Sequence, residues 1–213
     1  MRPRVKICGI TRVEDARLAA ALGADAIGVI FTPRSPRCVD AAQARAIRAA
    51  LPPLTALVAL LMDQDAAEVR TAIATARPDL LQFHGDETDD WCAQFGLPFF
   101  KTLPMATHTA LTPRMASYSS AAGFVLDGHA PGEPGGQGKA FDWTSLPAIG
   151  RPWLLAGGLT PHNIAAALRA AHPWGVDVSS GVEQSPGIKD AARLQAFFDE
   201  IHRETAACRP DPR

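Results

Sequence analysis

This chain of 213 residues has no large excess of positive or negative charge, no long apolar run and no closely spaced pair of cysteines. Lysine and arginine total 21 against 22 acidic residues, so the formal net charge is −1. No bulk field attracts a polyanion, and any anion must be bound locally. The longest apolar run, 54–62, contains Thr55 and is about half as long as a membrane-spanning helix. We therefore expect neither nucleic acid nor a membrane as a partner.

Signals for secretion and for a disulfide framework are missing as well. The basic start, 1–6, leads into Cys8 without an apolar stretch or a small-residue cleavage site, so we expect a cytoplasmic protein. The four cysteines stand at positions 8, 38, 92 and 208 and form no C-x-x-C pair. A disulfide framework is therefore not expected.

Apolar residues make up 47% of the chain, and short β-rich runs alternate with alanine-rich stretches of helical period. This alternation is typical of βα units around a parallel sheet. Strands are predicted at 5–8, 26–30, 54–62, 80–83, 99–102, 123–126, 152–156 and 175–178. Helices are predicted at 11–22, 41–50, 66–76, 88–95, 113–118, 164–171 and 190–203. The first helix would open with a capping box formed by Thr11 and Glu14, and only the helix slot near 143–149 has a weak signal.

Eight such units in 213 residues leave about 27 residues for each, near the lower limit of a (β/α)₈ barrel. We therefore predict a single-domain α/β TIM barrel over residues 1–205, followed by a frayed polar tail at 206–213. A doubly wound open sheet is the structural alternative. It would place a G-x-G-x-x-G turn after the first strand, where Gly9 stands alone.

Polar residues stand at the predicted strand ends, where barrel enzymes carry their active sites. Cys8 ends the first strand, Arg37 follows the second, and His84 ends the fourth. Asp127 ends the sixth strand, and Asp177 lies within the eighth. We expect these side chains to meet at one mouth of the barrel.

Two glycine-containing loops follow the last two strands, the usual phosphate-binding place in barrels. They contain Gly157-Gly158 and Ser180-Gly181. Backbone N–H groups and the positive end of a short helix hold a phosphate dianion without lysine. The alternative is that the glycines only form tight turns.

Asp127 and Cys8 are the candidate acid and base. Asp127 ends an apolar strand, and apolar surroundings would raise its pKa so that it keeps a proton; the alternative is a loop cap. Cys8 would act as a thiolate if helix ends or cations lower its pKa. Arg37 is one such cation and also suits a substrate carboxylate, the alternative being a solvated loop charge. The glycine-rich loop 128–138 is predicted to be a lid, or else a linker.

A catalytic metal is not expected, because His84, His129 and His162 follow neither H-x-x-x-H nor H-E-x-x-H spacing.

Taken in order, these motifs resemble those of the phosphoribosylanthranilate isomerases of tryptophan biosynthesis. The likeness runs from residue 4 to about 200, and the matching segments are 6–11, 35–37, 81–85, 126–127, 135–138, 141–143, 155–159, 175–183 and 186–190. Each segment alone is weak, but their order and spacing together are specific. Two positions depart from the family pattern. Phe83 replaces a leucine and is expected to repack the barrel interior, and Gln137 replaces a threonine in the lid.

The resemblance implies a cofactor-free Amadori rearrangement of a small phosphosugar, N-(5-phosphoribosyl)anthranilate. It implies that Asp127 protonates the furanose oxygen as general acid, and that Cys8 removes a proton beside the resulting Schiff base. Arg37 would bind the anthranilate carboxylate and Asp177 the sugar hydroxyls, with His84 among the substrate-binding residues. Amides near Gly158, Ser180 and Gly181 would hold the phosphate.

Three other interpretations of the site stay open. The histidine-pathway phosphoribosyl isomerase performs the same rearrangement. That family is expected to use a pair of carboxylates, which Cys8 does not match, and its second phosphate site has no glycine signature here. A non-catalytic phosphosugar-binding barrel would leave Cys8 as a core thiol. A covalent Cys8 nucleophile would need a partner histidine. A monomer is expected because no long exposed apolar face stands out, with a homodimer as the alternative.

Overall fold

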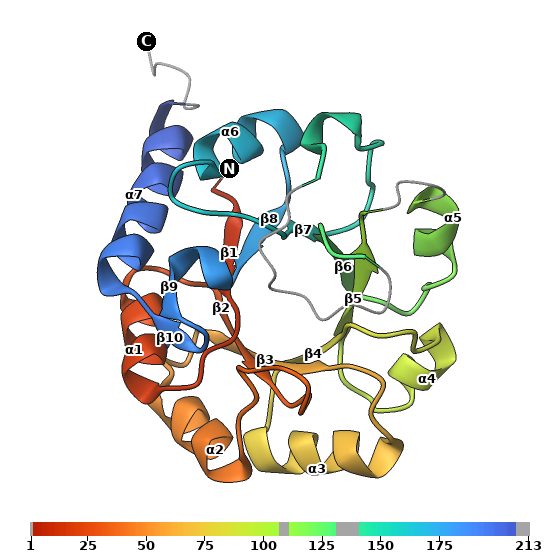
Figure 1. Ribbon diagram of the computed structural model, residues 1–213. Helices are drawn as coiled ribbons and strands as arrows, with labels where there is room; N and C mark the ends of the chain where they lie inside the picture. Colours follow the sequence, from red (N-terminus) through yellow and green to blue (C-terminus); the bar gives the residue numbers. More distant parts are fainter. Residues whose placement is uncertain (1, 107–110, 131–140, 208–213) are drawn as a thin grey trace.

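Eight parallel strands close into a barrel in chain order, and the first strand pairs with both the second and the last (Figure 1). The computed structural model describes residues 2–106, 111–130 and 141–207. The strands are β1 (Arg4–Ile7), β2 (Ala26–Ile30), β3 (Ala56–Leu61), β4 (Leu80–Phe83), β5 (Phe99–Pro104), β6 (Gly123–Asp127), β7 (Trp153–Leu155) and β8 (Gly175–Val178). The predicted TIM barrel is confirmed.

Helices surround this barrel on the outside (Figure 1). They are α1 (Val13–Ala21), α2 (Ala41–Ala50), α3 (Ala66–Ala76), α4 (Asp89–Ala93), α5 (Leu111–Ala116), α6 (Ile164–Ala171) and α7 (Ala191–Ala207). Helices α2 and α3 have the predicted bounds because Asp40 and Asp65 each accept the N3 backbone N–H in a capping box. Among the described residues, no helix is long and apolar enough to cross a membrane.

Alternation along each strand separates an outer apolar layer from a mixed interior. On β1, Val5 and Ile7 belong to the large core between strands and helices. Lys6, which stands between them in the sequence, is also buried but does not belong to that core. Two smaller clusters complete the interior: one contains Phe100, Val125, Leu154 and Ala156, and the other contains Cys8, Ile30 and Leu60. Because strand residues point alternately to opposite faces, a polar residue at an inward position is directed into the barrel.

Phe83 belongs to the outer layer, so the expectation that it repacks the barrel interior was wrong. Its ring meets Trp91 of α4 at 5.6 Å and Phe99 of β5 at 5.7 Å, both edge to face. The inward positions of the same strand are taken by its neighbours Gln82 and His84, as period-two alternation requires.

The predicted capping box of Thr11 and Glu14 does not form. Helix α1 begins at Val13, its N-cap residue is Arg12, and no side chain caps it. The Thr11 hydroxyl instead donates to the carbonyl of Gly187 at 2.6 Å. Gly187, with φ of +81°, turns a small hairpin of β9 (Glu183–Ser185) and β10 (Ile188–Lys189) that the sequence analysis did not predict. The first and last βα loops are thereby joined.

Between β6 and β7, the described residues 141–152 hold one short 3₁₀ turn, η1 (Trp143–Ser145), in the slot with the weak helix signal. The predicted lid lies outside the described residues from position 131 onward. At the carboxyl end, α7 continues to Ala207, past the predicted boundary at 205. Residues 208–213 of the predicted tail lie outside the described part.

A methyl group at Gly175 should destabilise the barrel. An added Cβ would lie 2.6 Å from the Arg4 carbonyl oxygen and 2.6 Å from Leu154 Cδ2. We expect Gly175→Ala to lower the free energy of unfolding by about 1–3 kcal/mol, measured by urea titration. Gly150→Ala is the control, because nothing lies within 4 Å of its added Cβ. Equal midpoints for the two variants would contradict the tight closure of β1 on β8.

Candidate active site

One cavity opens at the carboxyl ends of the strands, and all the side chains and loops chosen from the sequence line it. Its empty space, part of it open to solvent, is about 710 Å³. The lining includes the candidate site residues Cys8, Arg37, His84, Asp127, Gly157, Gly158, Asp177, Ser180 and Gly181. The structure therefore brings together every residue that the sequence nominated.

Cys8 follows β1 and reaches the cavity beside a glycine of the neighbouring strand. A Cβ on Gly28 of β2 would lie 2.8 Å from the Cys8 sulfur and 3.1 Å from Lys6 Cε. The absence of a side chain at Gly28 makes room for both groups. Cys8 is 5% exposed and is held at its backbone by Lys189, whose Nζ donates to the Cys8 carbonyl at 2.7 Å.

Burial raises the pKa of the Cys8 thiol above its ordinary value. The Lys6 ammonium is the largest opposing influence and lowers it, but less than burial raises it. The condition for a thiolate, a thiol pKa lowered by nearby cations, is therefore not met in the free site. The thiol is the main form of Cys8 at neutral pH.

Lys6 and Asp177 form an ion pair inside the barrel, with 2.9 Å between Nζ and Oδ2. They lie on β1 and β8, which pair in register at these two residues. Although burial is the largest influence on Lys6 and lowers its pKa, Asp177 and Cys8 together raise it above the ordinary value. Oδ1 of Asp177 has no hydrogen-bond partner among the described residues and is the atom left for a ligand.

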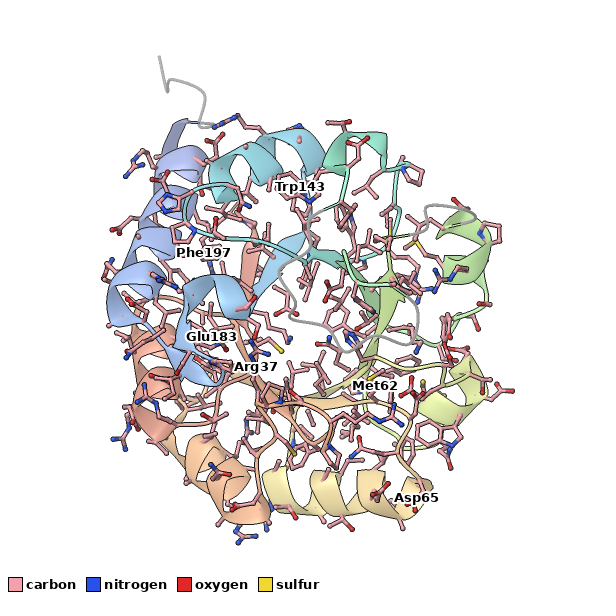
Figure 2. All side chains as sticks on the ribbon, in the orientation of Figure 1. Arg37, Met62, Asp65, Trp143, Glu183 and Phe197 are labelled. Atoms are coloured by element: carbon pink, nitrogen blue, oxygen red, sulfur yellow. The ribbon has the colours of Figure 1, made fainter. Side chains whose placement is uncertain are left out.

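Arg37 is buried rather than solvated, and it lies beside Glu183 (Figure 2). Its Nε and Nη2 donate to the two Glu183 oxygens at 2.8 and 2.7 Å. Lys189 donates to the same carboxylate at 2.8 Å. Burial raises the pKa of Glu183, but Arg37 and Lys189 lower it by more than burial raises it, so the carboxyl is ionised. One carboxylate thus holds two cations at the edge of the cavity.

Asp127 ends β6 beside two stacked histidine rings. His129 Nδ1 lies 3.5 Å from Asp127 Oδ1, and the rings of His129 and His84 are stacked with 4.4 Å between their centroids. Burial raises the pKa of Asp127, but the nearby His129, with a smaller effect of His84, lowers it by more and brings it below the ordinary value. The raised pKa that a general acid would need is therefore not present in the free site. Burial lowers the pKa of His84 to about 3, so its ring is neutral.

The three side chains His84, Asp127 and His129 place ligand-type atoms within 4.8 Å of one another. The two imidazole planes are only 23° apart and face each other. In-plane lone pairs of stacked rings run side by side, whereas tetrahedral metal ligands must point at a common centre. This arrangement suits the sharing of protons better than the binding of a metal.

The two loops after β7 and β8 meet as the phosphate prediction requires. Gly157 and Gly158 have φ of +83° and +66°, and Asn163 holds the second of them by donating to its carbonyl at 2.8 Å. A Cβ on Gly181 would collide with the Leu159 carbonyl oxygen, so only glycine lets the loops touch. Within the described chain, the amides of Gly157 and Gly158 donate no hydrogen bond to protein groups.

A comparison with protein-family models matches residues 5–200 to N-(5'-phosphoribosyl)anthranilate isomerase. A curated protein of that name from Xanthomonas campestris pv. campestris (strain 8004) is 50% identical over 210 residues, covering 95% of this chain and 94% of the relative. The chain belongs to the N-(5'-phosphoribosyl)anthranilate isomerase family.

Solved structures of the family agree with this assignment. The phosphoribosyl anthranilate isomerase from Thermus thermophilus has a TM-score of 0.84 and 40% identity, over 94% of this chain and 98% of that one. A second phosphoribosyl anthranilate isomerase was solved in complex with reduced 1-(o-carboxyphenylamino)-1-deoxyribulose 5-phosphate. It has a TM-score of 0.81 and 29% identity, over 94% of this chain and 99% of that chain.

In this member of the isomerase family, sequence reasoning overlooked Lys6, Glu183, Lys189 and His129. A signal existed for Lys6, because a single charged residue between Val5 and Ile7 must be paired once the strand is buried. Glu183 and Lys189 had no comparable signal, since their hairpin was not predicted. His129 was considered only as a metal ligand.

Glu183→Gln should destabilise this isomerase strongly. A neutral amide would leave Arg37 and Lys189 buried with too little negative charge, which costs about 3–5 kcal/mol in the free energy of unfolding. The control is Glu204→Gln, which removes a surface pair with Arg169 and should cost at most about 1 kcal/mol.

The cost should depend on pH. Because the pKa of folded Glu183 is lowered, its stabilising effect is complete above the unfolded pKa of roughly 4.3 and is lost as pH falls through the folded pKa. Denaturant titrations should therefore show a large difference in the free energy of unfolding between Glu183→Gln and wild type at pH 7. The difference should be small below about pH 4. A difference that does not change with pH would refute the role of the charge.

Proposed function

We propose that the chain isomerises N-(5-phosphoribosyl)anthranilate to 1-(2-carboxyphenylamino)-1-deoxyribulose 5-phosphate, with Cys8 as general base and Asp127 as general acid. The observation that carries this proposal is that one cavity is lined by a thiol, a carboxyl group and two glycine-containing loops. Membership of the isomerase family supports it.

The two ends of the substrate have separate binding groups. The phosphate is held by amides of the loops at 157–158 and 180–181, where main-chain dipoles replace a lysine. Glu183 takes the Nε and one Nη2 hydrogen of Arg37, which leaves Nη1 and the outer Nη2 hydrogen for the anthranilate carboxylate. Asp177 accepts from a sugar hydroxyl through Oδ1, and His84 borders the ring between these ends.

The reaction needs one proton donor and one acceptor. Asp127 gives its proton to the furanose oxygen as the C1'–O bond breaks, and the anthranilate nitrogen lone pair forms the C=N bond. The Cys8 thiolate then removes the C2' proton, and the electron pair of that bond forms the enolamine. Tautomerisation gives the ketone, and one proton returns from Cys8 to Asp127 through solvent. Each proton transfer contributes roughly 10²–10⁴-fold.

In the free site, the proton that the reaction needs on Asp127 lies on the sulfur of Cys8. Burial favours the Cys8 thiol, and the histidines favour the Asp127 carboxylate. Thiol with carboxylate and thiolate with carboxylic acid contain the same single proton, so the active form is the minor tautomer of the main form. Activity therefore requires exchange of that proton, not a change in the total number bound.

Removing either catalytic group should stop turnover without preventing binding. We expect Cys8→Ala and Asp127→Asn each to lower kcat by about 10²–10⁴-fold, because each removes one proton transfer. The reduced product analogue should still bind, measured by calorimetry. Cys92→Ala, in α4 on the outer layer, is the control and should keep its rate. Near-normal rates for both site variants would refute the assignment of acid and base, whereas a wild-type protein that binds the analogue without turnover would favour the non-catalytic barrel.

The pH profile should be broad. With one proton shared by the pair, kcat/KM falls only when both groups are protonated or both are deprotonated. We expect the acid limb below about pH 4 and the alkaline limb above about pH 9, outside the reference values of Asp and Cys. Alkylation of Cys8 at varied pH, followed by peptide mass spectrometry, should give the same upper pKa. Fast alkylation at neutral pH would contradict the raised thiol pKa.

We also propose that the monomer is active, because all the side chains and loops of the cavity come from one chain. Sedimentation of the active enzyme at assay concentration tests this, and an obligate dimer would refute it.

A further inference from the structure

Asp127 and His129 are held together by the backbone as well as by their side chains. Met105 donates to the Asp127 carbonyl at 2.8 Å, and Ala106 donates to the His129 carbonyl at 3.3 Å. The extension of β5 therefore fixes the segment that follows β6. His129 is 2% exposed, so its ring is shielded from solvent.

The His129 ring has one face against His84 and one nitrogen toward Asp127. Its Nδ1 is buried and forms no hydrogen bond among the described residues, because the 3.5 Å approach to Asp127 Oδ1 lacks hydrogen-bond geometry. Within the part of the chain that the structure describes, neither ring nitrogen of His84 has a hydrogen-bond partner. An unpaired buried nitrogen is costly, and a small movement of either side chain would form the bond. The mechanism above gives His129 no task.

We propose that His129 is a positioning residue for Asp127: from 3.5 Å away, its ring holds the carboxyl turned toward the furanose oxygen of the bound substrate. This inference rests on the proposed function. His84 supports the arrangement by stacking on one face of the His129 ring. When substrate displaces water, the environment of Asp127 becomes less polar, which favours transfer of a proton to the carboxyl that His129 has already oriented.

The charged and titratable groups around this pair come from four strands. His84 at the end of β4 and His129 face Asp127 directly. Asp177 of β8 interacts with Asp127 through its charge. Lys6 of β1 and Lys101 of β5 act on His84 and help to keep it neutral. His129 is therefore the only group facing Asp127 from the segment that also carries it, within the described chain.

The test compares two substitutions of His129. His129→Ala should lower kcat by about 10- to 100-fold, a part of the whole contribution of the acid, with KM within about twofold. It should also move the acid limb of kcat/KM upward by about one pH unit, because only His84 then opposes the effect of burial, which raises the pKa of Asp127. His129→Asn keeps an N–H donor near the position of Nδ1 and should recover most of kcat, with an intermediate limb.

His202→Ala, an exposed histidine on α7, is the matched control and should match wild type in kcat and in the acid limb. Thermal unfolding and circular dichroism confirm that each variant folds, and ¹³C NMR of the Asp127 carboxyl follows its titration independently of turnover. A His129→Ala enzyme with wild-type kcat and acid limb would overturn the inference, as would a His129→Asn enzyme no better than His129→Ala.

Asp127→Asn separates this inference from the function on which it rests. If Asp127→Asn is inactive and His129→Ala is normal, only the positioning role is refuted. If Asp127→Asn keeps its rate, the assignment of the acid is refuted and the positioning role with it.

Discussion

A single buried carboxylate, that of Glu183, links the parts of this barrel that must act together. It neutralises Arg37 from the loop after β2 and Lys189 from the hairpin after β8, and Lys189 in turn holds the carbonyl of Cys8. Buried cations without a counter-ion would be strongly destabilising. The position of Cys8 and the orientation of the Arg37 guanidinium therefore depend on the same acidic side chain.

The second organising feature is the distribution of protons among the titratable groups in the cavity. Inward positions of β1, β8 and β6 carry Lys6, Asp177 and Asp127, and each is placed by strand alternation. Their surroundings favour a neutral sulfur and a charged carboxyl in the free enzyme. An enzyme in this resting state is protected against oxidation, because the thiolate is the reactive form of cysteine. Substrate binding must then release the proton that the resting state keeps on sulfur.

Much of the architecture was predictable from local signals. Helices α2 and α3 have the expected bounds because Asp40 and Asp65 cap them through contacts within one turn. Helix α1 does not, because Thr11 bonds to Gly187, which is 176 residues away in the sequence. The hairpin around Gly187 is short and polar, and its strands have too few residues to show alternation.

The site was predictable in its members but not in its charges. Strand ends identified Cys8 and Asp127 because a barrel gathers them at one mouth. The direction of their pKa shifts could not be predicted, since it depends on burial and on residues from other parts of the chain. Cys8 becomes buried only when the barrel closes, and His129 reaches Asp127 only when β5 holds the segment after β6.

The contact between Lys189 and the Cys8 carbonyl spans 181 positions of the chain. During synthesis, Cys8 is therefore added long before the lysine that holds its carbonyl. Strand β1 also waits for β8 before its second edge is paired. A nascent polypeptide that has not yet reached β8 and Lys189 consequently carries Cys8 without the side chain that fixes its backbone. The surroundings of the sulfur are complete only after both have been added.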